Sequence, residues 1–383
     1  MKTPIYLDYA AATPLDERVF DAMRPYMLEQ FYNPSAAYDA ARQVRVAIDE
    51  ARHELAIAIG AKRDEIILTA GATESINLAF RGILNEGDHV VIGATEHQAV
   101  LAVASLYDYS VAACDIKGII RPDDVRSVIT DKTKLISITA ADSEIGSLQP
   151  LSKIAEILED VRRDRRARNI TQPLYLHSDA SQAAGAIDLH VARLGVDLLT
   201  LNAAKCYGPK QVGLLWVNTQ IQIKPLIVGG GQERGLRSGT ENVAGIVGFA
   251  LALRLAEKHR RGVTEELQKL RDQLQHGLVQ AIPELVVNGS KKKRLPGHLN
   301  ISLEELDAER VVFNLDSKGI MVATGAACAA NKGTRSTVLT AIGLSDSAAD
   351  GSLRFSMGRH TTKEQIEEAI PVIIEAIRHE AAL

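Results

Sequence analysis

The sequence predicts an α/β protein with a mainly parallel sheet in a large domain and a smaller α+β domain at its C-terminal end. Three observations support this prediction. Short apolar runs alternate with helical patterns between residues 65 and 217, which is typical of right-handed βαβ units. The runs are apolar throughout, as in strands that are buried on both faces. Beyond residue 255 the pattern changes to a mixture of helices and isolated strands.

The large domain is expected to contain seven strands, each a short apolar run. They cover residues 65–70, 89–94, 110–115, 134–140, 174–180, 196–204 and 213–217. Helical spacing lies between them at residues 74–84, 97–107, 123–129 and 151–163. An earlier helix has one apolar stripe, formed by Val44, Ile48, Ala51, Leu55 and Ile59, and Gly60 is expected to end it.

After the last of these strands, two long helices are predicted near residues 240–260 and 263–281. The remaining elements are a strand at 298–304, a helix at 307–319, strands at 320–325 and 353–360, and a final helix. We therefore expect a large domain at residues 15–255. The small domain would combine residues 1–14 with residues 256–383.

The bulk composition excludes several classes of protein. Lys and Arg total 44 against 48 Asp and Glu, a net charge of -4, which argues against nucleic-acid binding. No apolar run has the length of a signal peptide or membrane span. Three cysteines form neither a disulfide framework nor a zinc motif, so a cytoplasmic protein is expected. Two basic clusters, 162–168 and 291–294, are interpreted as solvated surface, with partner docking as the alternative.

Polar residues follow several predicted strands, at the sheet edge where doubly wound proteins bind ligands. Residues 71–75 open a helix after one strand, and their free N–H groups, with the hydroxyls of Thr73 and Ser75, favour an anion. His97, Asp179 and Lys205 follow other strands. Each has a simpler interpretation when taken alone: a helix N-cap, a structural histidine, a paired acid, and a surface lysine on a tight turn.

One cofactor requires this whole set of residues. Pyridoxal phosphate needs a lysine that forms a Schiff base and an acid that keeps the ring nitrogen protonated. It also needs donors for its phosphate, and a flat partner such as imidazole over its ring. The occurrence of all four at strand ends is a much stronger signal than any one of them.

The order of short motifs along nearly the whole chain resembles that of one family. This family is the class V, fold-type I pyridoxal-phosphate enzymes of the NifS/IscS-like cysteine desulfurase group. The matching motifs are YLDYAAATP, NPS, GATESINLAF, TEHQAV, SEIGSLQP, SDASQ, KCYGPKQVG, GGGQERGLRSGTEN, LPGHLNISLE, ATGAACAA and LRFSMGRHTT.

The resemblance implies a role for each residue that matches a family position. Lys205 corresponds to the Schiff-base lysine, and Asp179 to the partner of the ring nitrogen. Gln182 corresponds to the neighbour of the ring hydroxyl, and His97 to the stacking and proton-transfer histidine. Thr73 corresponds to a phosphate ligand, with Ala72 beside it.

Four more roles come from the same resemblance. Thr240 corresponds to a residue that reaches the phosphate of the other subunit, which implies a homodimer. Cys328, in a small and polar stretch, corresponds to the nucleophile, although a packed cysteine among alanines is the simpler interpretation of its neighbours. Arg354 corresponds to the binder of the substrate carboxylate, which suits a guanidinium fork. Asn33, in NPS, is also expected at the substrate.

The chain departs from the family at four site positions. Ala204 stands where the family has a histidine and Asn202 where it has a serine, and both family residues bind the phosphate. Ser143 replaces an asparagine near the ring hydroxyl and the substrate carboxylate, and Tyr38 replaces a histidine. Asn202 and Ser143 are still expected at the cofactor. The stretch 159–173 also looks longer than the family needs.

The resemblance implies a cysteine desulfurase, a transferase that converts L-cysteine to L-alanine. The sulfur would pass to Cys328 as a persulfide and then to an acceptor protein, for iron–sulfur cluster or thio-cofactor synthesis. Two alternatives stay open. Ser143 and Ala204 motivate a lyase or aminotransferase that acts on another amino acid. The second alternative is a weakly active protein that serves as a scaffold in sulfur trafficking. The retention of Lys205 and Asp179 argues against this alternative.

Overall fold

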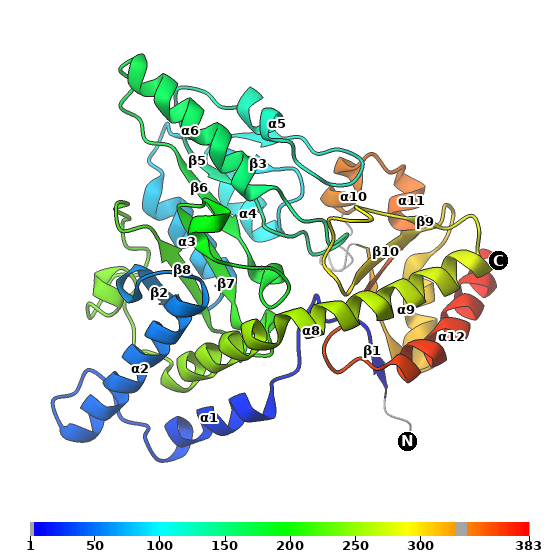
Figure 1. The fold of residues 1–383 in the computed structure, drawn as a ribbon, viewed down its shortest axis with the longest axis horizontal. Helices are drawn as coiled ribbons and strands as arrows, with labels where there is room; N and C mark the ends of the chain where they lie inside the picture. The colour runs from blue at the N-terminus through cyan, green and yellow to red at the C-terminus, as the bar shows by residue number, and fades with distance from the viewer. Residues whose placement is uncertain (1–3, 326–334, 383) are drawn as a thin grey trace.

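The computed structural model describes residues 4–325 and 335–382. This part of the chain has three sheets, of seven, four and two strands, and a long helix runs past the two larger ones (Figure 1). The largest sheet has seven strands in the order β2-β8-β7-β6-β5-β3-β4. In this sheet β8 alone runs in the opposite direction to the other strands. The prediction of a mainly parallel sheet is therefore confirmed. The strands are β2 Ile66–Thr69, β3 His89–Gly93, β4 Asp108–Ala112, β5 Thr133–Ser137, β6 Tyr175–Asp179, β7 Leu198–Asn202 and β8 Gly213–Val217.

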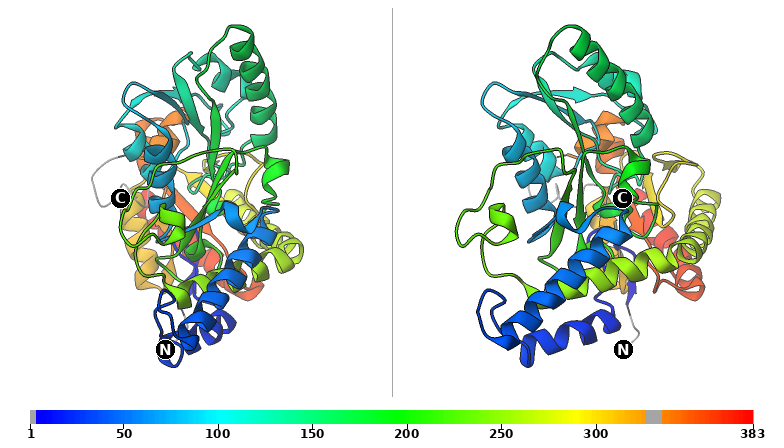
Figure 2. Two further views of the ribbon diagram at one scale, coloured as in Figure 1. Left: turned by 90° about the vertical axis from the view of Figure 1, so that its left-hand side faces the viewer. Right: turned by 60° about the vertical axis from the view of Figure 1, so that its left-hand side comes forward.

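Helices cover both faces of this sheet (Figure 2). Successive strand residues point to opposite faces, so Ile66 and Leu68 pack into one core while Ile67 packs into the other. The helices are α1 Glu17–Leu28, α2 Asp39–Ala58, α3 Ala72–Ile83, α4 Gln98–Ala104, α5 Pro122–Ser127, α6 Leu151–Ala167 and α7 Val191–Leu194. Short 3₁₀ turns are η1 Arg63–Glu65, η2 Ser181–Ala183, η3 Ala203–Lys205 and η4 Glu233–Gly235.

The second unit has an antiparallel sheet in the order β12-β13-β10-β9 and a separate parallel pair, β1 with β11. Its strands are β1 Ile5–Tyr6, β9 Val286–Val287, β10 His298–Ser302, β11 Ile320–Met321, β12 Ala323–Thr324 and β13 Ser352–Ser356. Its helices are α9 Ala308–Ser317, α10 Thr337–Ala341, α11 Asp346–Asp350 and α12 Lys363–Ala381. The unit has its own core. We propose the domain division at residue 255, which the separate cores support.

The prediction of two helices between residues 240 and 281 is wrong. One continuous helix, α8 Val243–Ala281, spans 39 residues and belongs to both cores. Phe249 lies in the first core and Leu274 in the second, so both ends are held by packing. Gly262, at the expected break, has open space around it. A glycine within a helix costs only about 1 kcal/mol, which the packing at the two ends outweighs.

The interpretation of residues 162–168 as solvated surface is wrong for Arg165. This side chain is buried within α6 and donates hydrogen bonds to the carbonyl oxygens of Thr130 and Gln172. Arg162 contacts Asp197. Arginine can satisfy several carbonyls at once because it carries five N–H donors. Arg165 therefore connects α6 to the loops that precede β5 and β6. In the second cluster Arg294 is also buried.

The two described cysteines differ in their surroundings. Cys206 follows the 3₁₀ turn η3 and is buried in the first core. Cys114 lies beyond the end of β4 and is only partly buried. Among the residues that the structure describes, no helix is long and apolar enough to cross a membrane.

A buried ion pair connects α2 to the loop after β8, and it carries our stability prediction. Glu233 accepts two hydrogen bonds of 2.6 Å from Arg52 and one of 2.9 Å from the Leu68 N–H. Replacing Glu233 with glutamine leaves a buried cation without its counter-charge. We expect the free energy of unfolding in urea to fall by about 3–5 kcal/mol.

The control for this prediction is an exposed ion pair. Glu54 lies 3.5 Å from Arg254, and both side chains are more than one third exposed. Glu54→Gln should cost about 1 kcal/mol or less. If Glu233→Gln and Glu54→Gln lowered the free energy of unfolding equally, the buried pair would contribute no more to stability than a surface pair.

Candidate active site

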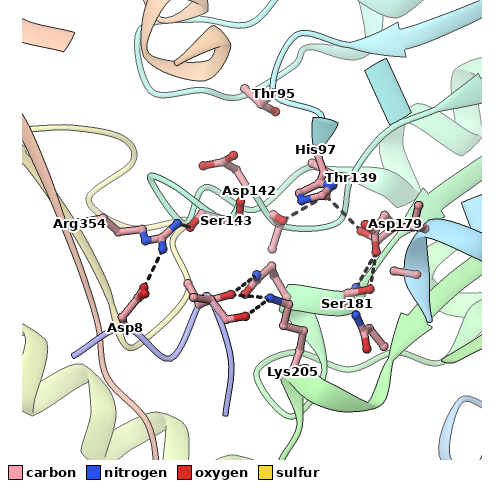
Figure 3. A pocket seen from close by; sticks show the side chains of 17 residues that line it. Asp8, Thr95, His97, Thr139, Asp142, Ser143, Asp179, Ser181, Lys205 and Arg354 are labelled. Carbon is pink, nitrogen blue, oxygen red and sulfur yellow. Dashed lines mark hydrogen bonds and ion pairs between the residues drawn. The ribbon is translucent and has the colours of Figure 1, made fainter. Parts of the chain in front are cut away.

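A cavity of about 380 Å³ lies at the carboxyl ends of the parallel strands, between the two units (Figure 3). Its wall has three sources: the strand ends of the large sheet, the N-terminal segment at residues 8–11, and Arg354 from β13. Most of the residues predicted for the site line this one cavity. They are Ala72, Thr73, His97, Ser143, Asp179, Gln182, Asn202, Lys205 and Arg354.

The start of α3 forms one end of the cavity. Gly71 is its N-cap at φ 135°, a conformation that side chains rarely adopt. A Cβ on Gly213 of the neighbouring strand would lie 2.7 Å from Gly71 Cα, so Gly213 is needed for this close packing and Gly71 for its backbone conformation. Ala72 and Thr73 follow in the first turn, where N–H groups are free to bind an anion. Ser75, also predicted here, is buried and hydrogen-bonded to Thr69 at 2.7 Å.

Lys205 ends the 3₁₀ turn that follows β7. Its Nζ donates hydrogen bonds of 2.7 Å to the carbonyl oxygens of Ala10 and Ala11. Gln182 also donates to Ala10 O, at 2.9 Å. The N-terminal segment therefore holds the lysine within the cavity wall, which explains why a lysine can stand at the end of a buried strand.

The Asn202 side chain begins the same turn. Its Oδ1 accepts from the Ala204 N–H at 3.2 Å. Because a backbone N–H can only donate, this bond fixes the orientation of the amide. The amino group of Asn202 then carries two donors, and among the described residues it has no hydrogen-bond acceptor.

Asp179 ends β6 and is held by a neighbour that the sequence analysis missed. Asp179 Oδ1 accepts from the Ser181 N–H at 2.9 Å and from its hydroxyl at 2.6 Å. Both bonds fix the orientation of the Asp179 side chain in the cavity wall. A carboxyl group held in this way has the position that a partner for a ring nitrogen needs.

His97 is the N-cap of α4, and its Nδ1 accepts from the Ala99 N–H at 3.1 Å. A nitrogen that accepts carries no hydrogen, so in the neutral ring the hydrogen is on Nε2. Burial lowers the pKa of His97; Asp179 opposes this shift and Lys205 adds to it. His97 is thus a neutral imidazole with a donor at Nε2.

Arg354 lies at the opposite end of the cavity from α3. Its Nη2 donates to Asp8 Oδ1 at 2.7 Å, and its Nη1 lies 3.4 Å from the Ser143 carbonyl oxygen. Asp142 and Glu144, on either side of Ser143, are buried carboxyls. Burial raises the pKa of both, and the charge of Asp142 adds to the effect on Glu144.

Two predicted site residues that the structure describes do not line the cavity, and a third lies outside the described residues. Asn33 lies in an exposed loop, where its Oδ1 accepts from the Ser35 N–H at 2.9 Å. Thr240 is exposed and does not line the cavity of a single chain. Cys328 lies outside the described residues. Tyr38, the fourth departure from the family, is the exposed N-cap of α2.

The cavity also contains residues to which the sequence analysis gave no role. Besides Ser181, they are Asp8, Ala10, Ala11, Thr95, Thr139, Ala141 and Asp142. The first three belong to the motif YLDYAAATP, which was noted without a role for any of its residues. Thr139 lies at the end of the strand predicted at residues 134–140 and Asp142 lies two residues beyond it, so their position near a strand end was the available signal.

The fold and the cavity define an α/β protein of the NifS-like type. A solved NifS-like protein superposes with a TM-score of 0.89 at 29% identity, covering 98% of this chain and 100% of that one. A solved structure described as SspA in complex with cysteine gives a TM-score of 0.77 at 31% identity, covering 94% and 100%.

The sequence comparisons give the family. The model described as aminotransferase class-V matches residues 5–368, and the chain belongs to this family. A cysteine desulfurase IscS from Dictyoglomus turgidum is 40% identical over 99% of this chain and 96% of its own length. The corresponding protein of Methanosarcina thermophila is 38% identical over 99% and 94%.

Proposed function

We propose that this chain is a pyridoxal-phosphate-dependent cysteine desulfurase. The observation that carries the proposal is one cavity that combines Lys205, the carboxyl group of Asp179, a helix N-terminus and the buried cation Arg354. Relatives of almost equal length named cysteine desulfurase IscS support it, and so does the solved relative in complex with cysteine. The same cavity supports a second candidate, a lyase or aminotransferase, because Ser143 leaves more room than the family asparagine.

The residues present fit the cofactor. The free N–H groups at the start of α3 and the unpaired amino group of Asn202 would hold its phosphate. Asp179 would hold its ring nitrogen, and His97 would lie over its ring. When bound, the cofactor supplies a protonated ring that withdraws electrons from the α-carbon of the amino acid.

Three side chains of this protein would then bind the amino acid and transfer its protons. Arg354 binds the carboxylate of cysteine through its guanidinium fork. Lys205 Nζ takes the proton from the α-carbon and carries it within the cavity. His97, neutral and with its hydrogen on Nε2, serves as a donor.

Cys328 is proposed as the nucleophile on the basis of its sequence motif. Its thiolate attacks the sulfur of cysteine, and the carbon–sulfur bond breaks. The products are alanine, after protonation of the carbon, and a persulfide on Cys328. An acceptor protein of iron–sulfur cluster assembly would then take the sulfur.

The proposal includes a cytoplasmic homodimer. Thr240 lies outside the cavity of its own chain, and it would reach the phosphate of the partner subunit. Asn33 would act at the substrate only after its loop is rearranged or covered by the partner. A measurement of mass in solution tests the dimer.

One experiment tests the proposed function. Purified protein with bound pyridoxal phosphate is given L-cysteine, and alanine, ammonia and pyruvate are measured. Alanine with a stoichiometric protein persulfide supports the desulfurase. Pyruvate and ammonia support the lyase, and no change in absorbance on adding cysteine would support the inactive scaffold.

The phosphate site gives a further prediction. Ala204 has no side-chain donor, and one hydrogen bond to a charged group contributes roughly 1.5–3 kcal/mol. Ala204→His should therefore lower the dissociation constant of pyridoxal phosphate by up to about one to two decades. This dissociation constant is measured by titrating the cofactor-free protein with pyridoxal phosphate and following the fluorescence.

Asn202→Ala is the matched variant for this titration. If the amino group of Asn202 already binds the phosphate, its removal should weaken binding by at least as much as the histidine strengthens it. An unchanged affinity in Ala204→His, together with a large loss in Asn202→Ala, would show that Asn202 has replaced the family histidine.

A further inference from the structure

Arg354 is a buried cation that forms its direct ion pair with Asp8, while the carboxyls of Asp142 and Glu144 interact with it from further away. Its side chain is only 5% exposed, and a buried charge is costly unless it is paired. Within the described residues, Asp8 is the carboxylate that forms an ion pair with it, at 2.7 Å. Nε of Arg354 is buried and has no hydrogen-bond partner among those residues. The guanidinium therefore keeps unused donors while Asp8 occupies one side.

The backbone of Asp8 is fixed to the strand that carries Arg354. Asp8 forms a parallel bridge with Ser356, two residues beyond Arg354 on β13. The Ser356 N–H donates to Leu7 O at 2.8 Å, and the Ser356 hydroxyl accepts from the Ala10 N–H at 2.8 Å. The ion pair thus joins two backbone segments that are already hydrogen-bonded to each other.

Asp8 also lines the cavity itself, at the end where Arg354 lies (Figure 3). Its side chain is 19% exposed, so it faces the space that an amino-acid carboxylate would enter. A carboxylate bound to Arg354 would share one guanidinium with Asp8. Two carboxylates on the same guanidinium repel each other, and this repulsion is screened less in a partly buried site than in water.

We propose that Asp8 is a positioning residue with two effects. It holds and neutralises Arg354 while no amino acid is bound, and its charge limits the affinity of the site for carboxylates. The product alanine leaves more easily as a result, because the Asp8 carboxylate replaces that of alanine on Arg354. This inference rests on the proposed function, in which Arg354 binds the carboxylate of the amino acid.

The test compares two ligands, one of which is negatively charged at the carboxyl position while the other is neutral there. L-alanine has the carboxylate, and L-alaninamide has a neutral amide in its place. Asp8→Asn keeps an oxygen acceptor for Arg354 and removes the negative charge. With the protein carrying pyridoxal phosphate, we expect the dissociation constant of L-alanine to fall about tenfold, and that of L-alaninamide to stay the same. The KM for L-cysteine should fall, with no gain in kcat.

Two control variants separate the effect of charge from that of structure. Asp8→Glu keeps the charge and should therefore not show the tighter binding of L-alanine that is expected for Asp8→Asn. Asp16 is another buried carboxylate of the N-terminal segment; it pairs with Arg18 and Arg359 and does not line the cavity. Asp16→Asn should leave the affinity for L-alanine unchanged. Thermal unfolding of each variant shows that it is folded.

The outcomes are distinct. Weaker L-alanine binding by Asp8→Asn, or equal changes for both ligands, would show that Asp8 only supports the structure, and would overturn the inference. A wild type that binds neither L-alanine nor L-cysteine would overturn the proposed function, and this inference with it. Tighter binding of L-alanine alone supports the inference.

Discussion

Replacement of Lys205 by alanine is expected to abolish covalent attachment of pyridoxal phosphate. Lys205 Nζ lies inside the cavity, held by the carbonyls of Ala10 and Ala11. Asp179, the proposed partner of the ring nitrogen, lines the same cavity. The fold should persist, because Lys205 belongs to neither hydrophobic core, and hydrogen bonds from a charged donor to backbone carbonyls contribute about 1.5–3 kcal/mol each. Turnover of cysteine should stop.

Borohydride reduction followed by peptide mapping measures this attachment. In the wild type, the reduced label should appear on the peptide that contains Lys205, and Lys205→Ala should carry none. Lys210, five residues further on and exposed, provides the control, and Lys210→Ala should be labelled like the wild type. A label on any other lysine of the wild type would show that the reactive lysine has been wrongly assigned.

Strand positions and the edge that carries the site could be predicted because they depend on local patterns. A parallel strand buried on both faces needs a continuous apolar run, and each predicted run of the large sheet overlaps an observed strand. Parallel strands place their carboxyl ends at one edge, so Asp179 and Lys205 had to be close. The exact register and the antiparallel direction of β8 have no such local signal.

Contacts between distant parts of the chain could not be predicted. Asp8 and Arg354 are 346 residues apart, and their ion pair exists only because the N-terminal segment crosses from the small unit to the large one. The predicted break between residues 260 and 263 is a second example. Packing at Phe249 in one core and Leu274 in the other keeps α8 continuous, and these contacts are not visible in the local sequence.

Burial also changed the interpretation of single residues. Ser75 was expected to donate to an anion, but its hydroxyl is used by Thr69. Arg165 was expected in solvent, but its guanidinium satisfies loop carbonyls. The chemistry of a side chain shows what it can bind, whereas its actual partner depends on which face of its helix meets the core.

The choice among three cysteines for the nucleophile depends on which thiol can ionise, because the thiolate is the reactive form. Burial raises the pKa of Cys114 to about 11 and that of Cys206 to about 12. At neutral pH both are almost entirely protonated. The sulfur of Cys206 also contacts the carbonyl oxygen of Ala203 at 3.4 Å, so it faces the core. These two thiols are therefore poor nucleophiles, which leaves Cys328 as the candidate.

Cys328→Ala should eliminate alanine formation while leaving amino-acid binding intact. Lys205, Asp179 and Arg354 do not need the thiol to bind cysteine or to move its α-proton, so cysteine should still change the absorbance of the bound cofactor. Mass spectrometry of the wild type after one turnover should find one added sulfur on the Cys328 peptide. Cys114→Ala, the control, should keep both alanine formation and the added sulfur. Alanine release by Cys328→Ala at the wild-type rate would exclude a protein nucleophile, and would favour a lyase in which sulfur leaves without one.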